Sequence, residues 1–150
     1  MKRHKRIERI AAIYKRREEQ ARAVWVQAEQ NRQAAEEQAQ QSAAALRDGV
    51  DTLRGGPGAC DPQAVLHGQW AVQQLERLHK AQLANARRMA QIAEGRRSPW
   101  MDKRQDLLTM EKWYERAKEQ WLRERALKEE AAMESTLEAH LTRKYQLESE

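Results

Sequence analysis

The residues of this chain that could support catalysis are few and scattered. Its four histidines are His4, His67, His79 and His140, and its single cysteine is Cys60. Nucleophilic catalysis needs a base beside the nucleophile, and no serine, cysteine or carboxylate stands at a spacing that suggests such a pair. We therefore expect a protein that is not an enzyme, with no catalytic, cofactor-binding or metal-binding residues and no small-molecule substrate.

The glycine-rich segment 55–58 is the next candidate, because glycine-rich loops can cradle phosphate. A phosphate-binding loop follows a strand and continues into Lys-Ser or Lys-Thr, whereas this segment continues into Ala59 and Cys60. Three glycines and a proline instead end a helix. Asp61 then supplies a capping carboxylate, and Pro62 suits the first position of the next helix. The segment predicts a turn at residues 54–61.

The distribution of charge suggests binding rather than chemistry. The net charge is +5. Residues 1–17 hold eight lysines and arginines against Glu8 alone, whereas residues 129–150 hold six glutamates against Arg143 and Lys144. Oppositely charged ends favour lying near each other or meeting a partner of matching polarity.

The composition predicts long helices. Charged residues make up 34% of the 150 residues, phenylalanine is absent and the mean hydropathy is −1.03, which leaves too little apolar material for a compact globule. Disorder is the alternative for such a chain, but the abundant Ala, Glu, Gln, Arg, Lys and Leu are strong helix formers. No window resembles a membrane span or a signal peptide, and a lone cysteine fits a reducing compartment, so we expect a cytoplasmic protein.

We expect an all-α fold, a long two-helix antiparallel coiled-coil hairpin forming one domain over 1–150. The helices should span about 3–53 and about 62–148. Steps of three and four residues predict a coiled-coil seam in the first helix, with Arg17 in the same register. After Ala35 the spacing shifts to Ala39 and Ala43, which predicts a four-residue stutter. The predicted seam residues before the shift are Ile7, Ile10, Tyr14, Ala21, Val24 and Ala28, and those after it are Ala39, Ala43, Leu46, Val50 and Leu53.

The second helix shows the same spacing over a longer stretch. Its predicted seam consists of Val72, Leu75, His79, Gln82, Ala86, Met89, Ala93, Leu107, Met110, Tyr114, Ala117 and Trp121, and later Leu137 and Leu141. We interpret His79 and Gln82 as polar residues that set the register rather than as ligands. Pro99 either kinks this helix or starts a new one capped by Ser98, and a kink is favoured because no loop residues surround it.

The two helices are unequal in length. Pairing outward from the turn gives facing residues whose numbers sum to about 115, so that Ile7 lies near Leu108 and Tyr14 near Met101. At about 1.5 Å per residue the helices span roughly 75 and 130 Å. Residues from about 115 onward then lack an intramolecular partner although they carry apolar groups, which implies a binding partner.

Several segments resemble the FliJ family of flagellar export proteins. They are the charged opening Lys2 to Arg9, the segment 32–38 (Arg-Gln-Ala-Ala-Glu-Glu-Gln), the glycine-containing turn, the segment 72–78 (Val-Gln-Gln-Leu-Glu-Arg-Leu), and the run from 113–117 (Trp-Tyr-Glu-Arg-Ala) through 131–134 (Ala-Ala-Met-Glu). The resemblance covers most of the chain and is one of architecture more than of invariant motif. The injectisome stalk proteins of virulence secretion share this architecture.

The resemblance implies a non-enzymatic coiled-coil stalk of the bacterial type III protein export apparatus, serving flagellum biogenesis and motility. Members of the family bind the hexameric export ATPase, contact the export gate FlhA at the inner membrane and handle export chaperones. The implied location is cytoplasmic, peripherally associated with the membrane export apparatus. The chain departs from the family at Ser42, Ala45 and Gly49, where relatives carry bulky residues at the export-gate contact.

If the chain is such a stalk, the end opposite the turn enters the ATPase ring. The basic residues at that end are the candidate partner-binding residues: Lys2, Arg3, Arg6 and Arg9 from the first helix, and Arg123, Arg125 and Lys128 from the second. The alternative is a free-standing basic coiled coil that binds nucleic acid or tethers proteins. No nucleic-acid-binding module is recognisable, and acidic residues are interspersed through the rest of the chain, which disfavours nucleic acid as the partner.

The hairpin predicts that the turn tolerates change and that the seam does not. Two extra glycines in segment 55–58 should change loop-closure entropy by well under about 1 kcal/mol. Leu75→Asp or Ile10→Asp should lower the melting temperature more, because each places a charge in the seam. Equal melting losses for loop and seam variants, measured by circular dichroism, would contradict the hairpin.

Overall fold

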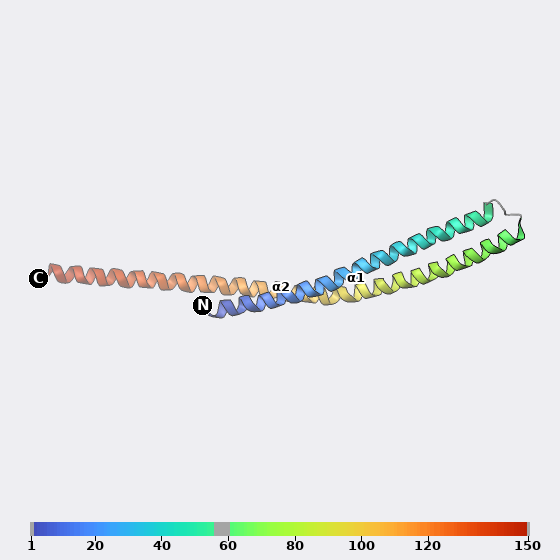
Figure 1. Cartoon of the computed structure of the whole chain (residues 1–150). Coiled ribbons are helices and arrows are strands. Elements are labelled where there is room, and N and C mark those ends of the chain that lie inside the picture. The colour runs from blue at the N-terminus through green and yellow to red at the C-terminus, as the bar shows by residue number, and fades with distance from the viewer. Residues whose placement is uncertain (1, 56–60, 150) are drawn as a thin grey trace. The chain divides into compact units, whose positions relative to one another are not determined.

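The computed structural model describes residues 2–55 and 61–149, with the side chain of Lys2 excepted. These residues form two helices, α1 (Lys2–Gly55) and α2 (Pro62–Glu148), and contain no strand (Figure 1). The two helices pack against each other, so the predicted all-α two-helix hairpin is confirmed. Residues 56–60 of the predicted turn, including Pro57 and Cys60, lie outside the described residues.

The hairpin divides into two compact units. The tip unit comprises residues 18–103, and the terminal unit comprises residues 1–17 together with 104–150. Each unit contains one stretch of α1 and one stretch of α2.

The start of α2 follows the predicted capping. The backbone N–H of Gln63 donates to Asp61 Oδ1 at 3.1 Å, and the N–H of Val65 donates to the carbonyl of Asp61 at 3.0 Å. Pro62 occupies the first helical position, where its missing N–H leaves no bond unmade. Further along, α2 continues through Pro99 without a break, so Pro99 does not begin a new helix and Ser98 is not a cap.

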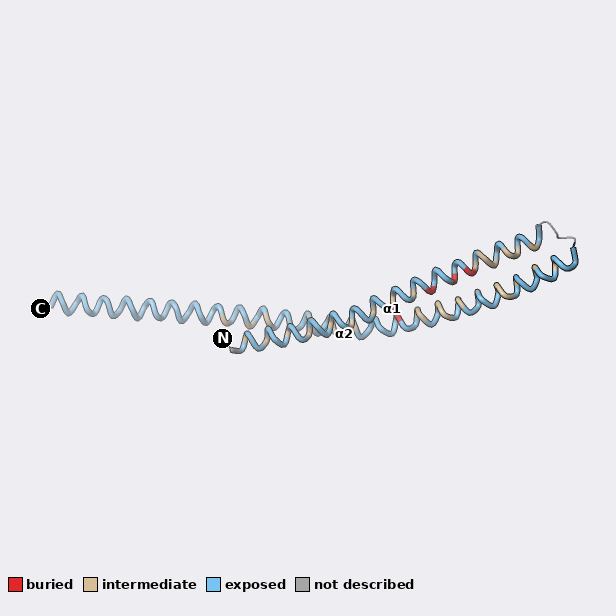
Figure 2. Tube along the Cα trace, viewed as in Figure 1, coloured by how far each residue is buried: buried red, intermediate tan, exposed pale blue. Residues whose placement is uncertain are grey.

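The seam of α1 is one unbroken heptad pattern, which corrects two predictions. Ile10 and Val24 were expected in the seam but are 42% and 50% exposed. Arg17 is exposed as well, and Ala11, Glu18 and Trp25 occupy the neighbouring seam positions. The predicted stutter is absent from α1, because the steps of three and four continue to its end. The seam residues are His4, Ile7, Ala11, Tyr14, Glu18, Ala21, Trp25, Ala28, Arg32, Ala35, Ala39, Ser42, Leu46, Gly49 and Leu53 (Figure 2).

The physical reason for the shifted seam is visible in the tip unit. The indole of Trp25 stacks on that of Trp100, with ring centroids 4.8 Å apart and planes 7° from parallel. Trp100 Nε1–H donates to Glu18 Oε1 at 3.0 Å. A stacked tryptophan pair with a bonded indole N–H stabilises the seam more than Val24 could. A prediction from the hydropathy of single residues chooses Val24 over Trp25, because it does not include the contact between Trp25 and Trp100.

The predicted seam of α2 is confirmed as far as Trp121, whereas Leu137 and Leu141, which the predicted pattern includes, are 61% and 52% exposed. Each predicted residue from Val72 to Trp121 is at least partly buried, including the polar His79 and Gln82. The pattern also includes Val65 and Gly68 before these residues, and Trp100 and Lys103 within the series. It stops at Trp121.

The predicted pairing between the helices is wrong by about six residues. Ser42 faces His79 and Leu53 faces Gly68, pairs whose numbers sum to 121 rather than 115. The predicted proximity of Ile7 to Leu108, and of Tyr14 to Met101, is therefore incorrect. The prediction counted outward from the middle of the predicted turn, whereas the contacts of Ser42 with His79 and of Leu53 with Gly68 set the alignment about six residues further along α2.

Small residues allow the helices to approach closely in the tip unit. The buried side chains of the described residues are those of Ala28, Ala35, Ala39, Ala93 and Ser42. A Cβ atom added to Gly49 would lie 2.9 Å from Leu75 Cδ1, and one added to Gly68 would lie 2.6 Å from Leu53 Cδ1. Each leucine thus packs where a glycine leaves room.

A polar contact between Ser42 and His79 also joins the helices in this unit. Ser42 Oγ donates to the carbonyl of Ala39 at 2.9 Å and lies 3.0 Å from His79 Nδ1. Because the serine hydroxyl donates its hydrogen to the Ala39 carbonyl, its oxygen is left to accept a hydrogen bond from the Nδ1–H of His79. Because this bond forms only in one alignment of the helices, it fits the register-setting role predicted for His79.

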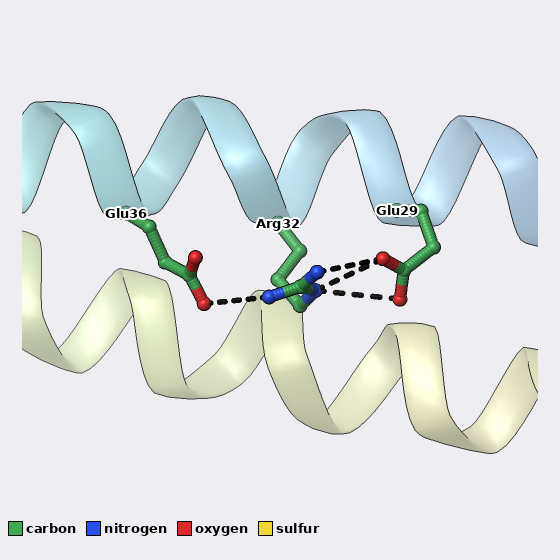
Figure 3. A network of polar contacts seen from close by, with 3 residues as sticks. All are labelled: Glu29, Arg32 and Glu36. Atoms are coloured by element: carbon green, nitrogen blue, oxygen red, sulfur yellow. Dashed lines mark hydrogen bonds and ion pairs between the residues drawn. The ribbon is translucent and has the colours of Figure 1, made fainter.

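Arg32 holds a seam position although it is charged. Its side chain extends toward α2 between two glutamates of its own helix (Figure 3). Arg32 Nη2 lies 2.7 Å from Glu29 Oε2, and Nη1 lies 2.8 Å from Glu36 Oε1. The hydrogen bond from Arg32 lowers the pKa of Glu29, and the bonds to both glutamates raise the pKa of Arg32. The two carboxylates keep the arginine charge compensated at the helix interface.

Acid should weaken this network. Because the pKa of Glu29 is lower in the folded chain, its stabilisation is fully present above the unfolded value of 4.5 and is lost as pH falls through the folded pKa. Glu29→Gln should therefore lower the melting temperature at pH 7, and the difference from wild type should shrink below pH 4.5. Glu37→Gln, which changes an exposed carboxylate of the same helix, is the control. A difference that stays constant down to pH 2 would contradict the assignment.

The glycines of α2 should respond differently to alanine. Gly95→Ala should stabilise the protein by about 0.5–1 kcal/mol, because alanine favours helix and nothing lies within 4 Å of the added Cβ. Gly68→Ala carries the same propensity gain but forces Leu53 to move, so its thermal stability should fall below that of Gly95→Ala. Equal gains would show that Leu53 adapts freely.

The corrected seam also ranks the two aspartate variants. Since Ile10 is partly exposed, Ile10→Asp should lower the melting temperature less than Leu75→Asp.

Candidate partner-binding surface

An aromatic cluster joins the two helices in the terminal unit. The imidazole of His4 stacks on Trp121, with centroids 5.3 Å apart, and on Tyr114, with centroids 6.1 Å apart. These residues occupy seam positions of α1 and α2, so the heptad pattern itself brings them together. The broad rings hold the start of α1 against α2.

Cations border this cluster. The guanidinium of Arg125 lies 5.5 Å from the ring centroid of Trp121, and Arg125 Nε lies 3.0 Å from Glu129 Oε1. Further along α1, outside this cluster, the guanidinium of Arg17 lies 5.7 Å from the ring centroid of Tyr14. An exposed cation–π contact contributes about 0.5–1 kcal/mol.

Beside the cluster, the terminal unit has an open groove with a volume of about 480 Å³. Arg3, His4 and Ile7 of α1 line one wall, and residues between Trp113 and Glu124 of α2 line the other. Three guanidiniums, those of Arg3, Arg116 and Arg123, border it together with the carboxylates of Glu119 and Glu124. The groove therefore combines aromatic and apolar side chains with an excess of positive charge.

Two features make this groove suited to an acidic peptide. Arginine binds carboxylates through paired, charge-assisted hydrogen bonds. Trp113 is 58% exposed, so much of its ring is available to an apolar side chain. In addition, His4 Nδ1 is buried and has no hydrogen-bond partner among the described residues. Such an atom destabilises the free protein until water or a partner bonds to it.

The predicted partner-binding residues are only partly gathered here. Arg3 and Arg123, which lie near opposite ends of the sequence, line the same groove, and Arg125 contacts its Trp121. Arg6 and Arg9 are exposed on α1 but do not line the groove. Lys128 is exposed on α2 beyond Trp121. The side chain of Lys2 lies outside the described residues.

Three groove residues escaped the sequence interpretation: His4, Trp113 and Arg116. His4 could have been found by extending the correct heptad back from Ile7. Trp113 directly precedes the seam residue Tyr114 and therefore flanks the seam, where a large aromatic side chain is a signal of a binding surface. Arg116 carries no such signal, because arginines are frequent along the whole helix.

Beyond Trp121, α2 has no intramolecular cover. Every residue from Leu122 to Ser149 is exposed, which places the start of this overhang seven residues later than predicted. The later start follows from the corrected pairing. Large apolar side chains remain exposed along it, with the highest exposed fractions at Leu127, Met133, Leu137, Tyr145 and Leu147.

Comparisons with known protein families, characterised proteins and solved structures found no match. No protein-family model matches the chain, and neither a characterised protein nor a solved structure is significantly similar to it. Within residues 2–55 and 61–149, neither helix has a stretch long and apolar enough to cross a membrane. In the same residues, no three histidine, cysteine or acidic side chains are grouped as a metal site requires.

Proposed function

We propose that this chain is a non-enzymatic stalk and coupling subunit of a bacterial flagellar type III protein export apparatus. Its terminal unit binds the hexameric export ATPase, and the export gate and export chaperones are further partners. The protein then works in the cytoplasm, peripherally associated with the export apparatus of the inner membrane. The injectisome stalk is the alternative within the same class.

The groove of the terminal unit is the observation that carries this proposal. The proposed ring contact needs basic residues of both helices on one surface, and Arg3 of α1 and Arg123 of α2 line the same groove. A two-helix hairpin without an enclosed pocket can act only through its surfaces and ends. The sequence resemblance to the stalk family supplies the identity of the partner.

The proposed contact is electrostatic with an aromatic centre. Guanidiniums at the groove attract carboxylates lining a ring, and Trp113 supplies apolar area. Exposed charge contacts are screened over about 8–10 Å at physiological ionic strength, so binding should weaken as salt is added.

A basic coiled coil that binds nucleic acid is the alternative from another class. It is favoured by the cations of α1 that do not line the groove, Arg6 and Arg9, which are free to contact phosphates. It requires no groove and no ATPase.

The cognate ATPase should discriminate between these functions. Arg3→Glu, Arg6→Glu and Arg9→Glu together should reduce stimulation of ATP hydrolysis at least about tenfold, because charge reversal turns attraction into repulsion. The matched control reverses Arg47, Arg54 and Arg87, which are exposed in the tip unit and give the same change in net charge. Helix content, measured by circular dichroism, should be unchanged in both variants.

Each outcome of this experiment is informative. Unchanged stimulation by the first variant would refute the basic end as the ring contact. If the wild-type protein does not stimulate the ATPase but binds DNA or RNA, and the first variant loses that binding, the nucleic-acid alternative is correct.

A further inference from the structure

The terminal unit contains two exposed surfaces of opposite character, although Arg123 of the first pairs with Glu119 and Glu129 of the second pairs with Arg125. One is the groove lined by Arg3, Arg116 and Arg123. The other is the segment 129–141 of the overhang, which carries four glutamates and neither lysine nor arginine. Positive and negative surfaces within one molecule can satisfy each other between two copies.

The overhang segment also carries the apolar residues that such a groove would take. Met133, Leu137 and Leu141 follow one another at steps of four residues, so they lie along one side of α2. They are 66%, 61% and 52% exposed. Glu130, Glu134 and Glu138 flank them and form no ion pair within the described residues. This is an amphipathic acidic helix without a partner.

The overhang cannot fill the groove of its own chain. α2 is one continuous helix, and Leu137 lies 16 residues beyond Trp121, about 24 Å further along the axis. Only another molecule can therefore place an acidic helix on the groove. A second copy carries that helix by definition.

We propose that two copies of the chain associate end to end through a two-fold axis, with segment 129–141 of each copy lying in the groove of the other. The groove residues of α2 extend from Trp113 to Glu124. For the two α2 helices to run antiparallel with these stretches side by side, the axis must pass close to Leu127. That side chain is 65% exposed and meets its symmetry mate there.

The symmetry strengthens the contact because every interaction occurs twice. In this arrangement Arg116 faces Glu138 of the second copy, and Arg123 faces Glu130. In the same register Met133 lies against Trp121, Leu137 against Ala117 and Leu141 against Trp113. A groove filled in this way is closed to any other acidic partner. The association needs only the protein itself and does not rest on the proposed export function.

Sedimentation velocity of the full chain over a range of concentrations tests the proposal. We expect a monomer–dimer equilibrium that shifts toward monomer with added salt. Leu137→Glu should raise the dissociation constant at least about tenfold, whereas Leu66→Glu, which changes a leucine of similar exposure in the tip unit, should not. A protein that stays monomeric at all concentrations, or a dimer that persists in Leu137→Glu, would overturn the proposal.

Charge reversal identifies which surfaces meet. Arg116→Glu alone and Glu138→Arg alone should each weaken the dimer. An equimolar mixture of the two variants should form a heterodimer, because each of its two contact sets then pairs opposite charges. If the overhangs paired only with each other, Arg116→Glu would leave the dimer intact and the groove assignment would be wrong. Both residues are exposed, so circular dichroism should show unchanged helix content.

Discussion

The whole hairpin depends on an unbroken heptad seam in which small residues let two helices approach closely. Alanines, Ser42 and two glycines occupy positions where most coiled coils carry leucine. Each alanine buries little apolar area, so the seam gains stability from its length and from the packing of Leu53 and Leu75 against glycine. The polar pair Ser42–His79 and the Trp25–Trp100 stack favour a single alignment along this uniform surface.

The terminal unit is built differently from the tip unit. There the seam positions hold His4, Tyr114 and Trp121 as well as alanines, and large rings flanked by arginines leave an open groove. Wide side chains hold two helices together with more exposed surface beside the seam, which is where a partner can bind. The difference in side-chain size between the two units therefore separates a structural seam from a binding surface.

Helix continuity explains why the terminal unit is incomplete on its own. Because α2 runs unbroken to Glu148 while α1 begins at Lys2, no part of α1 lies opposite the residues after Trp121. From Met133 to Tyr145 the large apolar side chains follow at four-residue steps rather than continuing the heptad, so they do not prolong the same seam. A molecule that covers these residues must bind a helix that carries both acidic and apolar side chains.

The sequence by itself determined the two helices and the seam of α2 as far as Trp121, because breakers and heptad spacing are local and act through backbone geometry. It also predicted that Arg3 and Arg123 belong to one surface. Only the tertiary structure decided the seam of α1, the pairing of the helices and the groove. The reason is that Ile10 and Ala11, or Val24 and Trp25, are adjacent candidates for one seam position, and local hydropathy favours the wrong member of each pair. The choice is made by contacts across the interface, such as Trp25 on Trp100 and Leu53 on Gly68, which no spacing within one helix encodes.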